Sequence, residues 1–325
     1  KCPFLDKCNY CSIYTAIGEE YLSNICTQFP RILNKINNEY EISLDVSCLE
    51  AAKIMLQSED KISFNSSEQV FEKYIINDEY NTNSKKYKKS PIKYLKEIRA
   101  FSMEIMQDRN YQLSERFYIL GDFIKTLEEK IEEDYKLVHS FIKDYDREKI
   151  AQKYKKNNMD YIFQIIFFKS IIEFSNIREQ AISDDFKKYI DEVLDGFNIN
   201  DIDNCGNDEE RYISIFQEYT ENFIKKYEYI FENYLVNYMY NNLFPFTESD
   251  DMLEGYIMLV VRYSFIRFYL VGRYINSKKE SSENIIKMIS LFARDIEHDK
   301  TYMSEIYDYI EKNQYDNMNF ANKLL

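Results

Sequence analysis

Glycine and proline are scarce in this chain, which limits the folds that it can adopt. Only six of its 325 residues are glycine and four are proline, and the glycines lie far apart. They cannot form the G-x-G-x-x-G turn of a dinucleotide-binding fold or the glycine-rich loop of a P-loop protein. An α/β protein of this length would normally contain about twenty glycines, at roughly 7% average usage. The sequence therefore favours helices.

Apolar residues recur at helical spacing through most of the chain after residue 90. The clearest run is Leu113, Phe117, Leu120, Ile124, Leu127 and Ile131. A helix is expected to begin at Ser90 and Pro91, because serine caps a first turn and proline there needs no N–H partner. Further helices are predicted at about 134–157, 158–180, 184–196, 210–243, 250–275, 281–297 and 300–314. We predict an all-α fold, with an all-helical domain over 90–325.

The charge of the chain limits its partners. The formal net charge of −14 argues against nucleic acid or an anionic membrane as a partner. The longest apolar stretch, 255–272, contains Arg262 and Arg267, and each would cost about 2.5–3.5 kcal/mol at a bilayer centre. That stretch is therefore expected to be a buried helix of a soluble protein. No secretory signal is evident, so we expect a cytoplasmic protein, and the missing initiator methionine suggests that upstream sequence is absent.

Cysteines are concentrated at the N-terminal end. Five lie in the first 48 residues, namely Cys2, Cys8, Cys11, Cys26 and Cys48, and Cys205 lies alone in an acidic loop. Residues 1–80 have weak periodicity and indicate a small, loop-containing module that cysteine ligands could stabilise. The polar segment 77–91 is predicted to be a solvated linker, and the alternative is a basic contact patch. Spacing alone leaves open a zinc site, an iron–sulfur cluster, disulfides or ordinary free thiols.

Nine short segments together resemble the flagellin lysine-N-methylase family. In the N-terminal part they are CPFL at 2–5, CSIY at 11–14, CTQFPR at 26–31 and SCLEAA at 47–52. Further along they are IR at 98–99, MQDR at 106–109, NYLVNY at 233–238, NLFPF at 242–246 and RDIEH at 294–298. They follow the order of the family over nearly the whole chain. The specificity lies in their combination, because each segment alone is short.

This resemblance implies an enzyme and its cofactors. The expected reaction is methyl transfer from S-adenosylmethionine to the ε-amines of flagellin lysines. The resemblance also implies a 4Fe–4S cluster, and the cysteines at motif positions are Cys2, Cys11, Cys26 and Cys48. The alternative class is a non-catalytic helical binding module with a structural zinc or iron–sulfur site, and a third possibility is an iron–sulfur redox protein.

The last of the nine segments contains the candidate catalytic residues, His298 and Glu297. A histidine of ordinary pKa, near 6.5, can accept a proton at neutral pH. Arg294 is expected to share a helix face with His298. Arg31 and Arg294 are candidates for binding the cofactor, because a guanidinium can bind a carboxylate through two hydrogen bonds. The alternatives are a structural polar network around His298 and a structural ion pair at Arg31.

Overall fold

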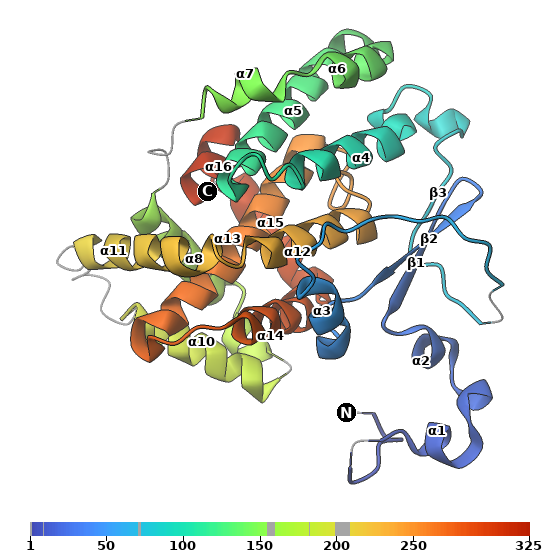
Figure 1. Ribbon diagram of the computed structural model, residues 1–325, viewed down its shortest axis with the longest axis vertical. Helices are drawn as coiled ribbons and strands as arrows, with labels where there is room; N and C mark the ends of the chain where they lie inside the picture. Colours follow the sequence, from blue (N-terminus) through green and yellow to red (C-terminus); the bar gives the residue numbers. More distant parts are fainter. Residues whose placement is uncertain (1, 9, 71–72, 155–159, 182, 199–208) are drawn as a thin grey trace.

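The computed structural model describes residues 2–8, 10–70, 73–154, 160–181, 183–198 and 209–325. Helices make up most of the described chain, and a small three-stranded sheet lies beside them (Figure 1). The predicted all-α class is confirmed for this largely helical body. The acidic loop that contains Cys205 lies outside the described residues.

The N-terminal part contains short helices and the sheet. Its elements are α1 (Ser12–Ile17), α2 (Asn24–Gln28), β1 (Arg31–Ile36), β2 (Glu39–Leu44), α3 (Leu49–Leu56) and β3 (Glu79–Tyr80). The helices of the body are α4 (Leu95–Met106), α5 (Leu113–Asp134), α6 (Val138–Asp144), α7 (Arg147–Ala151), α8 (Tyr161–Phe174), α9 (Ile177–Gln180), α10 (Asp184–Gly196), α11 (Glu209–Tyr219), α12 (Glu228–Asn241), α13 (Met252–Ser277), α14 (Ser282–Phe292), α15 (Lys300–Lys312) and α16 (Met318–Leu324). Short 3-10 turns lie at Glu19–Tyr21, Lys85–Tyr87, Pro91–Tyr94 and Tyr135–Leu137, and π-helical turns at Thr220–Ile224 and Ala293–Glu297.

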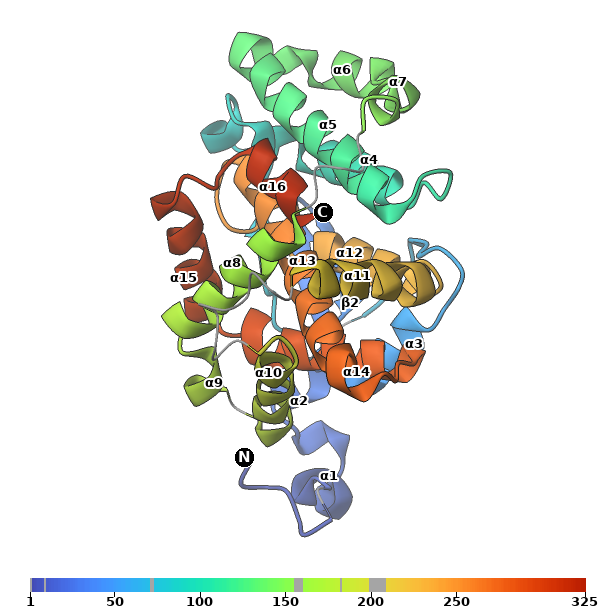
Figure 2. The ribbon, with the colours of Figure 1, turned by 90° about the vertical axis from the view of Figure 1, so that its left-hand side faces the viewer.

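Helix α13 is the centre of the body. It is long and apolar enough to cross a membrane, but its most apolar stretch is completely buried inside the protein. Helices α5, α10, α14 and α16 pack against it (Figures 1 and 2). Helix α10 approaches closely because both partners are glycines at the crossing, and a Cβ on Gly196 would lie 2.1 Å from the carbonyl oxygen of Gly272. The predicted buried helix over 255–272 is confirmed.

The predicted helical runs compare well with the structure, although three long predicted helices are interrupted. Ser90 Oγ accepts a hydrogen bond from the Ile92 N–H, and Pro91 opens the capped turn, but this turn is the 3-10 turn Pro91–Tyr94 and the α-helix α4 begins after it, at Leu95. The apolar run from residue 113 to 131 lies within α5. The predicted helix over 134–157 is divided into α6 and α7, and the one over 158–180 is divided into α8 and α9 at Asn176, whose backbone is left-handed (φ 47°). Positions 155–159 of these two predictions lie outside the described residues. The predicted helix over 210–243 is divided by a π-helical turn before α12. Apolar spacing continues through these interruptions, so it does not reveal them.

The sheet was not predicted. Strands β1 and β2 pair antiparallel through a tight turn in which Asn37 has a left-handed backbone (φ 58°), a conformation that asparagine tolerates. Strand β3 pairs parallel with β1, at Lys35 with Glu79 and Ile36 with Tyr80. The predicted solvated linker over 77–91 is therefore wrong at its start. The polar segment contains strand β3, which its side chains do not indicate. Thr82, two residues after β3, is buried against Asn37.

Polar contacts fasten the sheet to α12. The side-chain amides of Asn237 and Asn241 both donate to the carbonyl oxygen of Leu44 at the end of β2, at 3.0 Å each. Asn34 of β1 donates to the carbonyl oxygen of Asn241 at 2.6 Å. By contrast, α1 and α2 contain no buried residue and extend away from the body (Figure 1). The sheet thus forms a wall beside α12, and the candidate site lies along this wall.

Candidate functional site

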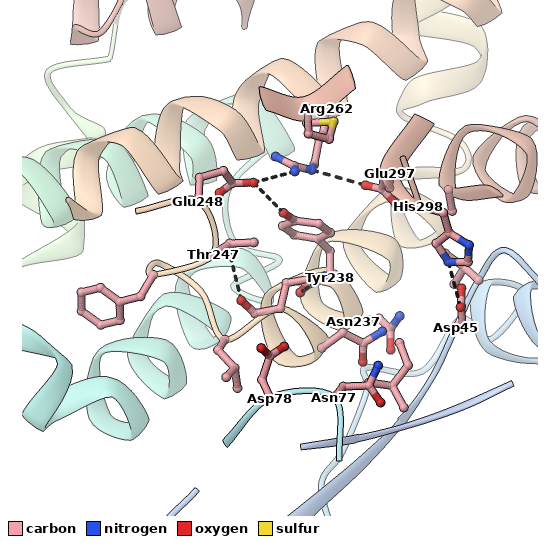
Figure 3. Close-up of a pocket in the computed structure, with 18 of the residues that line it drawn as sticks. Asp45, Asn77, Asp78, Asn237, Tyr238, Thr247, Glu248, Arg262, Glu297 and His298 are labelled. Atoms are coloured by element: carbon pink, nitrogen blue, oxygen red, sulfur yellow. Dashed lines mark hydrogen bonds and ion pairs between the residues drawn. The ribbon is translucent and has the colours of Figure 1, made fainter. Parts of the chain in front are cut away.

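A cavity of about 640 Å³ lies between the sheet, α12, α13, the 243–248 loop and the turn at 293–298 (Figure 3). Four of the nine quoted segments, or the residues next to them, contribute to its lining. They supply Val46 with the adjacent Asp45, then Tyr234, Asn237 and Tyr238, then Asn242, Leu243 and Phe246, and finally Glu297 and His298. Segments that are up to 253 positions apart in sequence therefore meet at one site.

Arg262 of α13 organises the buried side of the cavity. Its side chain is only 4% exposed, and its Nη2 lies 2.6 Å from Glu248 Oε1. Its Nε lies 3.4 Å from Glu297 Oε1, and its guanidinium stacks 4.5 Å from the ring centroid of Tyr238. A buried arginine needs such compensation, because an unpaired charge is costly away from water. Arg262 therefore fixes two carboxylates in the cavity wall.

The loop that carries Glu248 approaches α13 closely because of a glycine. A Cβ on Gly255 would lie 1.9 Å from the carbonyl oxygen of Pro245, which is too close for any other residue. Asp251 caps the start of α13 next to this contact, since its side chain accepts a hydrogen bond from the Glu254 N–H. The close approach brings Glu248 within reach of Arg262.

Two tyrosines of α12 complete this network as hydrogen-bond donors. The Tyr234 hydroxyl donates to Glu297 Oε1 at 2.6 Å, and the Tyr238 hydroxyl donates to Glu248 Oε1 at 3.2 Å. Burial raises the pKa of both hydroxyls well above the ordinary value, and the adjacent carboxylates raise it further. Both hydroxyls therefore stay protonated at neutral pH.

The π-helical turn at Ala293–Glu297 directs Glu297 and His298 to different partners. The backbone N–H of His298 bonds to the carbonyl oxygen of Ala293, five residues earlier, which widens the helix here. Glu297 faces Arg262, and burial raises the pKa of its carboxyl although Arg262 and Tyr234 act to lower it. A buried carboxylate of raised pKa is a better proton acceptor than an ordinary one.

His298 pairs with Asp45 at the other side of the cavity. His298 Nε2 lies 2.9 Å from Asp45 Oδ2, and Asp45 Oδ1 accepts a hydrogen bond from the Ser47 N–H at 2.8 Å. The bond to Asp45 raises the pKa of the half-exposed His298, against the effect of its partial burial. Burial acts to raise the pKa of Asp45. The hydrogen bond from His298, the positive charge of His298 and the hydrogen bond from Ser47 together act more strongly in the other direction, so the pKa of Asp45 lies below the usual range of an aspartate. The pair therefore favours an ionised Asp45 and a protonated His298.

This pairing predicts a pH-dependent contribution to stability. Because the pKa of His298 is raised on folding, its pairing with Asp45 stabilises the folded state fully below about pH 6.5, the pKa of an unfolded histidine. This stabilisation is lost as the pH rises through the pKa of His298 in the folded state. Because the pKa of Asp45 is lowered on folding, its carboxylate stabilises the folded state above about pH 3.9, the pKa of an unfolded aspartate. This stabilisation is lost as the pH falls through the pKa of Asp45 in the folded state. Asp45→Asn should therefore lower the melting temperature most at about pH 5.5 and least at about pH 9. Thermal melts at both pH values check this, and an equal loss at both would contradict it.

The other predicted site residues lie elsewhere. Arg294 is almost half exposed and its Nε pairs with Asp295 Oδ2 at 3.1 Å, because the π-helical turn removes it from the face that carries His298. Arg31 begins β1, and its Nη1 lies 3.5 Å from the carbonyl oxygen of Thr27. Neither arginine lines the cavity. The structure brings together Glu297 and His298, and their catalytic role stays a prediction.

The cysteines do not form a metal site within the part of the chain that the structure describes. Cys2, Cys8 and Cys26 are exposed, Cys11 and Cys48 are partly buried, and all five are free thiols. No group of three or more His, Cys, Asp or Glu side chains among the described residues is placed to hold a metal ion. Cys48 precedes α3, which packs on the body, whereas the other four lie on the outer N-terminal arm. A cluster bound by Cys2, Cys11, Cys26 and Cys48 stays a prediction.

Sequence reasoning missed Arg262, Glu248, Asp45 and Asp78 as members of the site. Arg262 lies in the apolar stretch 255–272, outside all nine segments. Asp45 lies two residues before the SCLEAA segment, and Glu248 lies two residues after NLFPF, so proximity to a motif was the available signal. Asp78 had no signal, because it lies in a polar stretch without periodicity.

A second cavity, of about 760 Å³, lies between α8, α11 and α13. Arg267, Tyr263 and Glu228 are among its lining residues, and it contains no residue of the nine quoted segments. Arg267 there bonds to Gln164 and to the backbone of Leu324 and Leu325. We therefore take the first cavity as the candidate site.

Comparison with known proteins places the chain in a family, and the matched part includes residues of both cavities. A family model described as the FliB lysine N-methylase C-terminal domain matches residues 99–324, which is more than half of the chain. The chain belongs to the FliB lysine N-methylase family. This FliB-family match includes Arg262, Glu248, Glu297 and His298, whereas Asp45 and Asp78 come from the part before it.

Two curated relatives of the FliB-family chain carry the name lysine-N-methylase. They come from Salmonella typhimurium (strain LT2) and Salmonella choleraesuis (strain SC-B67). Each is 32% identical over 81 residues, which is 25% of this chain and 19% of the relative. The matched part thus spans about a fifth of each relative's length. No solved structure matches.

Proposed function

We propose that the first cavity is the reaction site of a protein-lysine N-methyltransferase that uses S-adenosylmethionine and acts on flagellin. Membership of the FliB family supports lysine methylation as the activity. The charge and shape of the cavity support a site for cationic reactants. Family membership does not specify the methyl donor or the protein substrate, so S-adenosylmethionine and flagellin are our own proposals.

The observation that carries the proposal is the charge of the cavity lining. Among the described residues, four carboxylates line the cavity, those of Asp45, Asp78, Glu248 and Glu297, and the basic side chains in the same lining are Arg262 and His298. Tyrosines of α12, α15 and β3 also line it. The sulfonium donor and the lysine ammonium are both cations, and carboxylates and tyrosine faces suit both. A volume of about 640 Å³ lies within the range of ligand pockets, roughly 300–1,000 Å³.

The target lysine must lose a proton before it can react. At its ordinary pKa of about 10.4, roughly one lysine in 2,500 is a free amine at pH 7, which corresponds to about 4.6 kcal/mol. Glu297 suits the role of proton acceptor, because its carboxyl is largely buried and has a raised pKa. His298 can take the proton only in its neutral form, and Asp45 favours the charged form.

The residues of the cavity would then support methyl transfer. S-adenosylmethionine supplies, when bound, a methyl group on a positively charged sulfur. The lysine nitrogen forms the new N–C bond with its lone pair, and the electrons of the broken C–S bond stay on sulfur. Glu297 takes the proton that the nitrogen loses. Tyr234 and Arg262 hold Glu297 in place for this step, through the 2.6 Å and 3.4 Å contacts described above.

Mass spectrometry of flagellin tests the proposal. After incubation with the protein and S-adenosylmethionine, lysine-containing peptides should gain the mass of one or more methylene units. Flagellin incubated without the donor is the control. A non-catalytic helical module, the alternative class, would leave the masses unchanged, and that result would reject the proposed activity.

The 4Fe–4S cluster is a separate part of the proposal, and no step above depends on it. Its support is the resemblance that places Cys2, Cys11, Cys26 and Cys48 at motif positions. Protein purified without oxygen should contain iron and sulfide, and changing these four cysteines to serine should remove both. Zinc in place of iron would favour a structural zinc site. Metal analysis that finds neither would contradict a bound metal.

A further inference from the structure

We propose that Asp78 recruits the lysine ammonium of the substrate at the mouth of the cavity. The inference rests on the proposed function and assigns one residue of the site to substrate binding. Asp78 lies directly before β3, on the segment 73–82 that forms one rim of the cavity. We call residues 73–82 the rim segment.

Asp78 differs from the other three carboxylates of the cavity in its lack of a cation partner. Asp45 pairs with His298, and both Glu248 and Glu297 pair with Arg262. Among the described residues, no lysine, arginine or histidine forms an ion pair with Asp78, and its side chain accepts no hydrogen bond. Its negative charge is therefore available to a cation that enters the cavity.

The location of Asp78 suits recruitment rather than deprotonation. Its side chain is exposed, whereas the Arg262 network is buried. Figure 3 shows Asp78 and Asn77 on the wall opposite Arg262 and Glu248. A carboxylate beside an ammonium stabilises the charged form, so it attracts lysine without activating it. An exposed rim carboxylate and a buried proton acceptor on the other wall separate these two tasks.

Backbone contacts on two sides hold the rim segment in place. Gln28 of α2 donates from Nε2 to the carbonyl oxygen of Ile75 at 2.9 Å and accepts from the Ile75 N–H at 2.5 Å. On the other side, the Lys35 N–H of β1 donates to the carbonyl oxygen of Asp78 at 2.9 Å. Asn77 N–H also donates to the carbonyl oxygen of Leu33 at 2.8 Å. Asp78 is thus exposed but carried on a fixed backbone.

The neighbouring residue Glu79 provides a matched control. Successive side chains of a strand point to opposite faces, and Glu79 does not line the cavity. Its carboxylate is already paired with Lys35 Nζ at 2.6 Å. Glu79→Gln and Asp78→Asn therefore remove the same charge one position apart, and only the second removes it from the cavity.

Binding of two peptides tests the inference without requiring turnover. A flagellin peptide with its target lysine is compared with the same peptide carrying norleucine, by calorimetry with S-adenosylhomocysteine present. The natural chain should prefer the lysine peptide by about threefold to tenfold, as for a partly exposed charged contact. Asp78→Asn should abolish this preference, whereas Glu79→Gln and the conservative Asp78→Glu should retain most of it. The preference should also weaken as salt is added.

The outcomes separate this inference from the proposed function. Loss of the lysine preference in Asp78→Asn alone supports recruitment by Asp78, whether or not flagellin is methylated. An unchanged preference in Asp78→Asn, an equal loss in Glu79→Gln, or no preference in the natural chain overturns it. Methylation of flagellin together with any of these three results leaves the activity in place and rejects only the role of Asp78.

Discussion

Replacing Arg262 with methionine should lower the free energy of unfolding by about 3–5 kcal/mol. The guanidinium is buried on α13 between Glu248 and Glu297, and methionine would leave both carboxylates without their cation. Removing one partner of a buried ion pair is costly, because the remaining charge is desolvated and unpaired. Denaturation in urea, monitored by helical circular dichroism, measures the change.

Arg273 on the same helix is the matched control for this change. It pairs with Glu192 but is partly exposed, so Arg273→Met should cost about 1 kcal/mol or less. Adding Glu248→Gln to Arg262→Met should recover part of the lost stability, since one unpaired charge disappears. A cost for Arg262→Met as small as that for Arg273→Met would contradict the ion network at the cavity wall.

Glu297→Gln should reduce the rate of lysine methylation by a factor of about 10² to 10⁴. Glutamine has nearly the shape of glutamate and can still accept the hydrogen bond from Tyr234, but it cannot take a proton. The fold should therefore survive, while the step that frees the lysine amine is lost. Initial rates of methyl incorporation, at saturating donor and flagellin, measure the effect.

Two further variants test whether the loss of rate is specific to Glu297. Glu283→Gln, in the first turn of α14, removes an exposed carboxylate that does not line the cavity and should leave the rate unchanged. His298→Gln tests the neighbouring acceptor. A large loss for His298→Gln with a normal rate for Glu297→Gln would transfer the role of proton acceptor to His298 and reject our assignment.

The sequence predicted those parts of the fold that depend on local spacing. The run from Leu113 to Ile131 and the Ser90 cap both appear in the structure, because helix periodicity and capping involve residues only a few positions apart. The β1–β2 hairpin was missed although Asn37 and Asn38 are suitable turn residues, since the strands beside them are short and mixed in polarity. Strand β3 pairs with a segment more than forty residues away, which no local pattern records.

The same limit applies to the site. Glu297 and His298 were found because they lie inside a short motif. Their partners could not be found in this way, since Arg262 reaches Glu248 across 14 residues and His298 reaches Asp45 across 253. The π-helical turn explains why Arg294 was misplaced, because four-residue spacing does not keep residues on one face where the helix widens.

The central claim is that the first cavity binds the methyl donor. Hydrogen–deuterium exchange with and without S-adenosylhomocysteine tests it most directly, because it maps binding along the chain. Exchange should slow in 234–248 and 293–298, while 209–228 around the second cavity stays unchanged. Protection confined to 209–228, or no protection anywhere at saturating S-adenosylhomocysteine, would contradict the claim.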